Sequence, residues 1–300
     1  MGRNLAEYLP ALGYDVHGFT HHTLDLLDET AVVGAVSAIN PEVIIHCAAV
    51  GGTRKTGYDT GSADVASKNL RMFFNLERSL NPGMRMINLG SGAEYDKRRY
   101  LPKMTETYFD KSVPADPYGF SKYVVSKYIG KTDNVTCLRV FGLFGRYEDY
   151  TFKFISNAIV KNLLGLPIVI NQNVVFDYLC IEDLCGMIDK LLQIEPGHAH
   201  YNITPTDSID LVSLAETINS AAKTKSEIKV LNPGMNTEYT GSNVRVLKEL
   251  GGFNFTPYDK SVKQLYAYYA ARLNELDQEA VKKDSFLKAC KTYGGAADKI

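Results

Sequence analysis

Short apolar runs separated by helical segments dominate the first 140 residues, and this alternation is the feature that most constrains the fold. The run at residues 42–47 is apolar without a break, as in strands that are buried on both faces of a parallel sheet. Helical patterns follow it at residues 63–80 and 118–129. Strands separated by helices of this length form βαβ units. The sequence therefore predicts an α/β fold with a doubly wound parallel sheet.

Other elements are predicted from local signals. Residues 4–12 form a helical pattern that Gly13 closes, and Asp28 is a suitable N-cap for a helix at residues 29–39. The remaining strands of this part are expected at residues 16–20, 85–89 and 135–141.

The alternation loosens after Gly145, which indicates two unequal parts. A chain of 300 residues that is 45% hydrophobic can bury a large core in one domain or in two. We expect residues 1–145, rejoined by about 174–195, to form the larger part. Residues 146–173 and 196–275 are expected to form a smaller lobe. The charged tail at residues 276–300 is predicted to be a solvated or partly frayed helix.

Composition excludes several classes of partner. The formal net charge of −1 gives no basic field for nucleic acid, and the longest apolar runs are too short to span a bilayer. Five cysteines without a C-x-x-C pair fit a reducing cytoplasm better than a disulfide framework. The adjacent His21 and His22 lack further ligands at a metal-binding spacing, so no metal site is predicted.

Tyr118 and Lys122 form the strongest candidate for chemistry. Four residues apart on a helix, their side chains leave the same face. A nearby ammonium favours the phenolate and lowers the pKa of a tyrosine, so the phenol can exchange a proton with a carbonyl or alcohol oxygen. Ser91, after the strand at 85–89, could hydrogen-bond the same oxygen.

The spacing alone proves little. Nineteen tyrosines and the lysines of this chain make roughly 1.4 such pairs by chance. A second pair, Tyr123 and Lys127, overlaps the first. Context favours Tyr118, because Pro117 precedes it at a helix start and Gly119 allows a close approach.

A set of further motifs supports that preference by its order and spacing. In chain order they are Asp25-Leu26, His46-Cys47-Ala48-Ala49, Asn69, Gly90-Ser91, Tyr118-Gly119-x-Ser121-Lys122, Leu138-Arg139-Val140-Phe141 and Phe176-Asp177-Tyr178. Together they resemble the extended short-chain dehydrogenase/reductase family, of the NAD-dependent epimerase/dehydratase type. The runs at residues 48–52 and 88–91 are similar to those of GDP-fucose synthase-like enzymes.

The resemblance implies a Rossmann-type sheet that binds NADP or NAD, a smaller C-terminal substrate lobe, and a nucleotide-sugar substrate. It also implies that Tyr118 is the acid/base, that Lys122 holds the nicotinamide ribose and that Ser91 orients the substrate oxygen. The other cofactor-binding residues implied are Gly2, Asp25, Leu26, Ala48, Ala49 and Asn69. The candidates for contact with the substrate and its phosphates are Gly51, Gly52, Arg146 and Lys153, with Lys161 as a further cation. Members of the family commonly pair as homodimers through a helix bundle that includes the Tyr118 helix.

The chain departs from the family pattern at its start. The family begins with a strand and a Gly-x-x-Gly-x-x-Gly turn for the pyrophosphate, and here only Gly2 matches its last glycine. Because that strand is central in the sheet, its two neighbours would be unpaired. We therefore expect the true chain to begin roughly 10–15 residues earlier. Thr20, His21 and His22 occupy the place where an acidic residue would favour NAD. Because no acid is present there, the sequence favours NADP.

Three positions narrow the reaction. Gly92 stands where dehydratases of the family carry an acid. Ala93 and Tyr147 stand where GDP-fucose synthase has the cysteine and histidine of its epimerisation. What remains is reduction of a 4-keto sugar or C4 epimerisation. The alternative is a catalytically silent binding protein of the same fold, given the missing phosphate turn.

Overall fold

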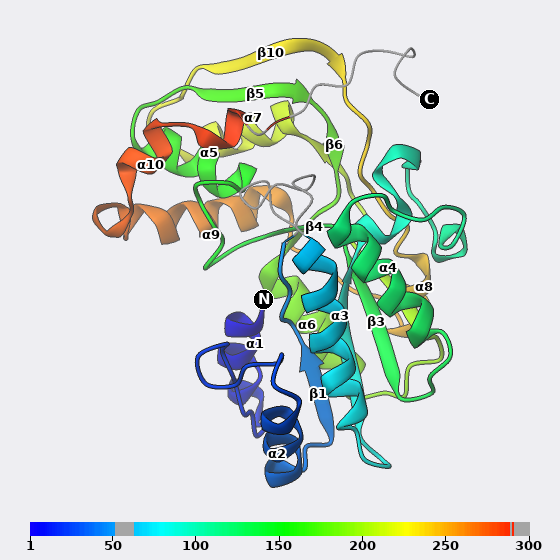
Figure 1. Ribbon diagram of the computed structural model, residues 1–300. Coiled ribbons are helices and arrows are strands. Elements are labelled where there is room, and N and C mark those ends of the chain that lie inside the picture. The colour runs from blue at the N-terminus through cyan, green and yellow to red at the C-terminus, as the bar shows by residue number, and fades with distance from the viewer. Residues whose placement is uncertain (52–62, 289, 291–300) are drawn as a thin grey trace.

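A parallel sheet of four strands, covered by helices on both faces, forms the lower part of the computed structural model in Figure 1. The structure describes residues 1–51, 63–288 and 290. The strands lie in the order β1-β2-β3-β8, and every neighbouring pair is parallel. Their bounds are β1 Val43–His46, β2 Arg85–Ser91, β3 Val135–Val140 and β8 His200–Ile203. The predicted doubly wound parallel sheet is confirmed.

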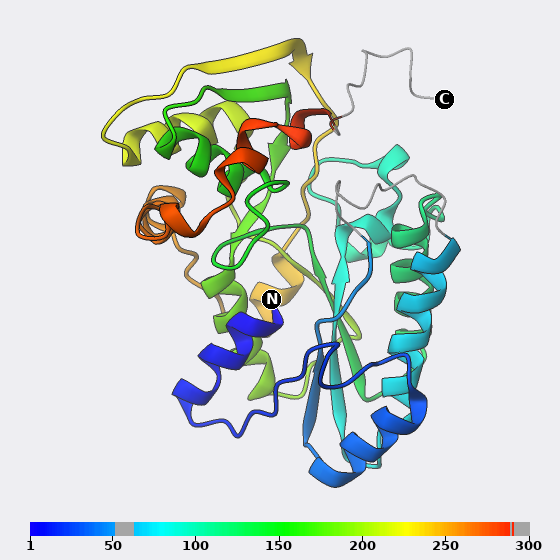
Figure 2. The same ribbon diagram turned by 60° about the vertical axis from the view of Figure 1, so that its left-hand side comes forward.

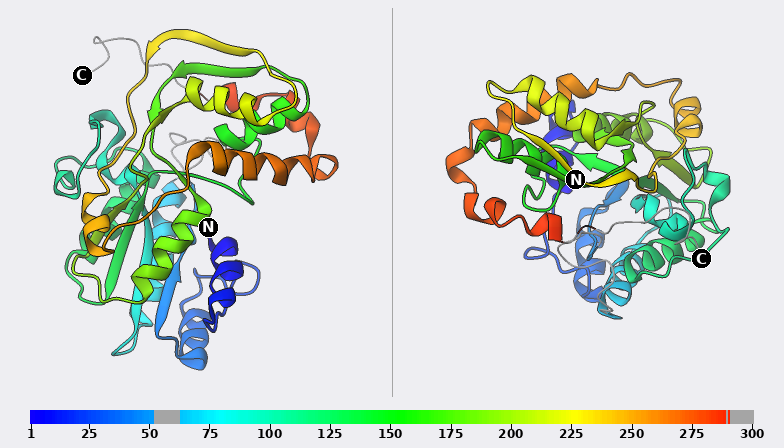
Figure 3. Two further views of the ribbon diagram at one scale, coloured as in Figure 1. Left: turned by 180° about the vertical axis from the view of Figure 1, so that it is seen from behind. Right: turned by 90° about the horizontal axis from the view of Figure 1, so that it is seen from above.

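Two hydrophobic cores lie on opposite faces of this sheet, because successive side chains of a strand point to opposite sides. Met86 and Cys137 face one core, and their neighbours Ile87 and Leu138 face the other. The first core contains α2 Glu29–Ile39, α3 Ala63–Arg78 and α4 Pro117–Ile129. The second contains α1 Gly2–Tyr8, α6 Ile181–Leu192 and α8 Val244–Glu249, seen from behind in Figure 3.

The first forty residues differ from expectation in two places. The predicted helix at 4–12 is divided into α1 and the 3₁₀ helix η1 Pro10–Leu12, which ends at Gly13 with a φ of 92°. The prediction of a strand at 16–20 is wrong. No described strand pairs with that run, and β1 pairs only with β2. A strand exists through the hydrogen bonds of a neighbour, so β propensity alone did not form one.

The smaller lobe lies above the sheet in Figure 2. Within this lobe β5 pairs in parallel with β10, and the remaining strand pairs are β4 with β7, parallel, and β6 with β9, antiparallel. Helices α5 and α7 pack on β5, and α9 packs against both helices around one shared core. The bounds are β4 Gly142–Phe144, β5 Ile168–Asn173, β6 Val175–Phe176, β7 Tyr178–Cys180, β9 Ile209–Asp210, β10 Ile228–Met235, α5 Phe154–Leu163, α7 Leu211–Ala221 and α9 Tyr258–Ala270.

The tail is more ordered than its charge predicts. Residues 276–288 contain α10 Gln278–Lys282 and α11 Ser285–Lys288, and Val281 is fully buried in the lobe core. The Nζ of Lys161 also contacts Asp284 Oδ2 at 2.6 Å. This described part is helical with mostly exposed or half-buried residues, as expected, and its departure from the prediction is the buried side chain of Val281. The remaining short helices are η3 Gly92–Tyr95, η4 Lys97–Arg99, η5 Glu106–Tyr108 and η6 Leu273–Glu275.

Membrane insertion of a helix finds no support in this architecture. Among the described residues, none of the helices combines the length and the apolar character needed to cross a bilayer.

Candidate active site

Ser91, Tyr118 and Lys122 come together at the carboxyl end of the sheet. Ser91 is the last residue of β2, and Tyr118 lies in the first turn of α4, whose N-cap Asp116 accepts a hydrogen bond from the Gly119 amide at 2.9 Å. The Ser91 side chain lies close enough to the Tyr118 phenol to lower its pKa. A side chain on Gly119 would place its Cβ 2.8 Å from the Ala93 carbonyl, so this glycine is what lets α4 approach the loop after Ser91.

The protonation of this trio differs from the sequence expectation. Burial raises the pKa of Tyr118 to about 12, and the bond from Ser91 only partly opposes that rise. Burial lowers the pKa of Lys122, whose Nζ donates to the Leu89 carbonyl at 2.8 Å and lies 6.0 Å from the centre of the Tyr118 ring. The ammonium is therefore directed at the backbone, and the predicted lowering of the tyrosine pKa by Lys122 is not found in this arrangement.

The competing pair, Tyr123 and Lys127, lies on the outer side of α4. Both side chains bond the exposed carboxylate of Asp110, Lys127 at 2.5 Å. The hydrogen bond between Tyr123 and Asp110 raises the pKa of Tyr123 to about 12. The two pairs have the same spacing, yet only Tyr118 meets the hydroxyl of Ser91.

Asn69 joins the loop after β1 to the start of α4. Its side chain bonds both the N–H and the carbonyl of Val50, at 2.8 and 3.0 Å, and also Ser121 Oγ at 3.1 Å. Gly51 follows with a φ of +79°, and a Cβ there would lie 3.8 Å from the Tyr118 ring. Gly51 thus borders the trio, whereas Gly52 lies outside the described residues.

The edge beside β1 carries small exposed residues and polar atoms without partners in the described part of the chain. Ala48 and Ala49 are exposed, and Gly2 begins α1 where a Cβ would be 3.5 Å from that of Cys47. Two buried polar atoms nearby, Asn4 Oδ1 and His46 Nδ1, have no hydrogen-bond partner among the described residues. Small exposed residues and unsatisfied polar atoms at the carboxyl ends of parallel strands fit a dinucleotide.

Asp25 and Leu26, two of the predicted cofactor-binding residues, differ in their exposure. Asp25 is exposed, with Oδ1 accepting from the Leu27 amide at 2.9 Å, while the Leu26 side chain packs against the α2–α3 core. His21 and His22 are exposed with ring centres 3.6 Å apart. No group of three or more metal-ligating side chains occurs in the described part of the chain.

The predicted phosphate-binding cations have carboxylate partners. Arg146 contacts Glu7 at 3.8 Å and Glu182 at 3.3 Å, which ties it to α1 and α6. Lys161 is buried against Asp284. Lys153, the half-buried residue before α5, stays a candidate for substrate contact.

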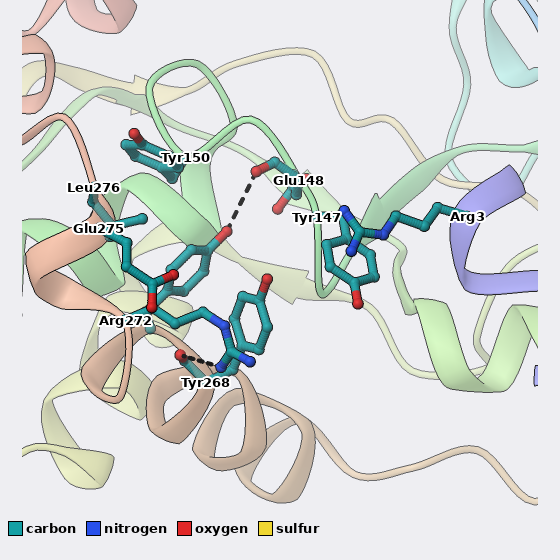
Figure 4. A pocket seen from close by; sticks show the side chains of 9 residues that line it. Arg3, Tyr147, Glu148, Tyr150, Tyr268, Arg272, Glu275 and Leu276 are labelled. Carbon is teal, nitrogen blue, oxygen red and sulfur yellow. Dashed lines mark hydrogen bonds between the residues drawn. The ribbon is translucent and has the colours of Figure 1, made fainter. Parts of the chain in front are cut away.

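A cavity of about 430 Å³, which no sequence pattern predicted, lies between the start of α1, the loop after β4 and the end of α9 (Figure 4). Two arginines stack on tyrosines at its wall, Arg3 on Tyr147 at 3.8 Å and Arg272 on Tyr268 at 4.3 Å. None of the residues predicted for chemistry or cofactor lines it.

A second feature that the sequence reading missed lies directly beneath Ser91. Glu94 and Arg139 form an ion pair with 2.6 Å between Oε2 and Nε, and each side chain is 1% exposed. The two residues are 45 positions apart, so no local spacing could reveal their contact.

A parallel, doubly wound sheet with a serine, a tyrosine and a lysine at its carboxyl edge defines a Rossmann-type dinucleotide-binding protein. The model of the NAD dependent epimerase/dehydratase family matches residues 1–204, so the chain belongs to that family. A search of curated proteins found no match.

Solved structures agree with this fold. The chain is similar to a UDP-glucose 4-epimerase from Thermotoga maritima with UDP-glucose (TM-score 0.77, 20% identity, 91% of this chain and 96% of that one). It is also similar to a GDP-mannoheptose C4 reductase from Campylobacter jejuni with NADP bound (0.77, 17%, 89% and 94%). A third is dTDP-4-dehydrorhamnose reductase from Bacillus anthracis in complex with NADP (0.73, 20%, 89% and 94%).

Proposed function

We propose that this chain is an NAD(P)-dependent oxidoreductase that acts at C4 of a nucleotide-activated sugar, by reducing a 4-keto group or by C4 epimerisation. The observation that carries the proposal is that Ser91 lies beside Tyr118 at the carboxyl end of the sheet. The Lys122 ammonium lies 6.0 Å from the centre of the Tyr118 ring. Residues 1–145 and 174–195 would hold the cofactor, and residues 146–173 and 196–275 the sugar nucleotide. The similarity to GDP-fucose synthase stays a prediction.

In reduction, Tyr118 donates its proton to the carbonyl oxygen of the sugar as the C–O bond becomes an alcohol. A bound reduced nicotinamide supplies the hydride to the carbonyl carbon. Ser91 donates a hydrogen bond to the same oxygen and so fixes it at the phenol. Lys122, whose Nζ donates to the Leu89 carbonyl, would stabilise the phenolate that the transfer leaves behind by turning toward it. In epimerisation, the phenolate form of Tyr118 would first accept the alcohol proton while an oxidised nicotinamide, when bound, would take the C4 hydride, and proton and hydride would then both return to the ketone with the hydride on its other face.

Support for NADP over NAD comes from the end of residues 16–20. No acidic residue occupies positions 20–22, and the exposed imidazoles of His21 and His22 can donate hydrogen bonds to a 2′-phosphate. Two of the similar reductases were solved with NADP. The odd number of cysteines and the lack of a C-x-x-C pair support a cytoplasmic enzyme.

We also propose a homodimer built on the outer surface of α3 and α4. Phe120 is 40% exposed there, and Phe74 and Tyr128 pack edge to face at 5.0 Å on the same side. Two copies related by a two-fold axis would cover these rings and form a four-helix contact.

The test is NADPH oxidation in the presence of nucleotide-activated 4-keto hexoses. Tyr118→Phe should lower turnover by at least about 100-fold, because general acid catalysis contributes that much. Tyr123→Phe is the matched control and should retain activity. Loss of turnover in Tyr123→Phe but not in Tyr118→Phe would contradict the assignment.

The silent-binding alternative makes a different prediction. NADPH at a hundredfold excess over its Kd should stabilise the fold by about 2.7 kcal/mol in either case. Binding without consumption of NADPH for any 4-keto hexose would favour the alternative.

A further inference from the structure

The Glu94–Arg139 ion pair calls for an explanation other than stability. Both side chains are 1% exposed, and a fully buried ion pair is often no more stabilising than apolar residues of the same volume. Its place in the fold is specific, since Glu94 lies in η3 directly after Ser91 and Arg139 lies in β3 opposite Gly90.

The Glu94 carboxylate fixes Ser91 through the backbone. Oε1 accepts the Ser91 amide at 2.9 Å, while Ser91 Oγ accepts the Ala93 amide at 3.1 Å. These reciprocal bonds form a capping box that sets both the main chain and the hydroxyl of Ser91. The second carboxylate oxygen, Oε2, is held by Arg139.

Arg139 carries the network to the helix of Tyr118. Its Nη2 donates to Ser126 Oγ at 2.8 Å, and Ser126 lies one turn after Lys122 on α4. Nη1 donates to the Tyr95 hydroxyl at 3.3 Å, and the guanidinium lies 4.2 Å from the centre of the Phe109 ring. One arginine therefore connects the loop that holds Ser91 with the helix that holds Tyr118 and Lys122.

Gly90 provides the space for this arrangement. A Cβ at Gly90 would lie 2.5 Å from Glu94 Oε1 and 2.5 Å from Cys137 Sγ, which is closer than atoms approach. Its φ is not in the positive region, so the demand for glycine here is for room alone. The Glu94 carboxylate therefore occupies space that is available because residue 90 is a glycine.

We propose that Glu94 and Arg139 are positioning residues that hold Ser91 and Tyr118 at the distance needed for proton transfer to the sugar oxygen. This inference rests on the proposed function for the reaction that it serves. Neither side chain is exposed to a substrate, since each is 1% exposed. Both residues act through Ser91 and α4.

The charge of Glu94 has a separate effect on the acid/base group. Glu94 and Asp116 raise the pKa of Tyr118, and Ser91 lowers it. Glu94, Cys137 and Cys47 raise the pKa of Lys122 against burial, and His46 is the further titratable group near that ammonium. Removing the charge of Glu94 leaves the Arg139 cation unbalanced, so the pKa values of Tyr118 and Lys122 should both fall.

The test compares Glu94→Gln with Glu106→Gln. Glu106 is a matched control, because it is also buried, accepts the Asn202 amide at 2.8 Å and faces Arg245 at 3.7 Å, away from Ser91. In Glu94→Gln we expect kcat to fall by about 10- to 100-fold with KM for the sugar nearly unchanged. The Tyr118 limb of the pH profile should move to lower pH. Glu106→Gln should keep the wild-type profile.

A second variant separates geometry from charge. Arg139→Lys keeps a cation but cannot bond Glu94 and Ser126 through a planar fork, so kcat should fall while the pH profile stays in place. A folded Glu94→Gln or Arg139→Lys protein with wild-type kcat would overturn the proposal.

A readout that needs no turnover keeps the two proposals distinct. The ¹³C resonance of the Tyr118 ring, assigned by its absence in Tyr118→Phe, can be titrated in wild type and in Glu94→Gln. The titration should move to lower pH in the variant even if no 4-keto sugar is reduced. An unchanged titration would refute the role of Glu94, whereas a missing substrate would refute only the proposed function.

Discussion

His46 should make the stability of this protein strongly dependent on pH. It ends β1 with 4% exposure, and no described residue gives its Nδ1 a hydrogen bond. Burial, together with the nearby Lys122 ammonium, lowers the pKa of His46 to about 3. The imidazole is therefore neutral in the fold at any pH where the chain is ordinarily handled.

The sign and the size of the effect follow from the two states. An unfolded histidine has a pKa of about 6.5, so below that pH the unfolded chain binds a proton that the native state refuses. Stability is complete above pH 6.5 and is lost progressively toward about pH 3. At pH 5 the loss is 1.5 units at 1.36 kcal/mol each, or about 2 kcal/mol. Because pH 5 is well above the native pKa, this figure depends little on its exact value.

Urea unfolding at pH 7.5 and pH 5.0 measures this loss. In His46→Leu, which has a similar volume and cannot titrate, the difference in unfolding free energy between the two pH values should shrink by about 2 kcal/mol. His200→Gln is a parallel case, since burial and the Arg139 cation lower the pKa of His200 to about 4. An identical pH dependence in wild type and His46→Leu would refute the reasoning.

Three further outcomes are expected. Gly51→Ala should cost about 1 kcal/mol in urea unfolding and reduce turnover, since Gly51 has a φ of +79° and a Cβ there would lie 2.9 Å from Val65. Asp177→Ala should cost about 3 kcal/mol by the same measurement, because its fully buried carboxylate holds Lys103 at 2.9 Å and two other donors. Phe120→Glu should convert a dimer into a monomer in sedimentation velocity, with urea stability unchanged within about 0.5 kcal/mol for an exposed position.

The parallel sheet could be predicted because its signals are local. The unbroken apolar run at 42–47 predicts a buried strand and the pattern at 118–129 predicts a helix. Both elements form where expected. The run at 16–20 has the same local character but fails, since a strand needs a partner that local sequence does not name. Val281 shows the opposite error, because a charged tail can still bury one apolar side chain in a distant core.

The candidate site divides in the same way. The spacing of Tyr118 and Lys122 could be read from the sequence, but Tyr123 and Lys127 share it, and only the fold separates Ser91 from Asp110 as partners. Contacts across the fold, such as that of Glu94 with Arg139, leave no trace in spacing. They are also what sets the protonation of the site, because burial and long-range charge are properties of the folded chain.

The protonation of Tyr118 bears on which of the two C4 reactions this site is arranged for. With its pKa raised to about 12, the phenol carries its proton at neutral pH and can donate it at once, as reduction of a ketone requires. Oxidation of an alcohol, the first half of an epimerisation, needs the phenolate, and the raised pKa of Tyr118 disfavours that form at pH 7. Lys122 would have to leave the Leu89 carbonyl and turn to the phenol to favour the phenolate. If the proposed function holds, we therefore expect reduction rather than epimerisation, because an epimerase on this scaffold would need Lys122 to move in every cycle.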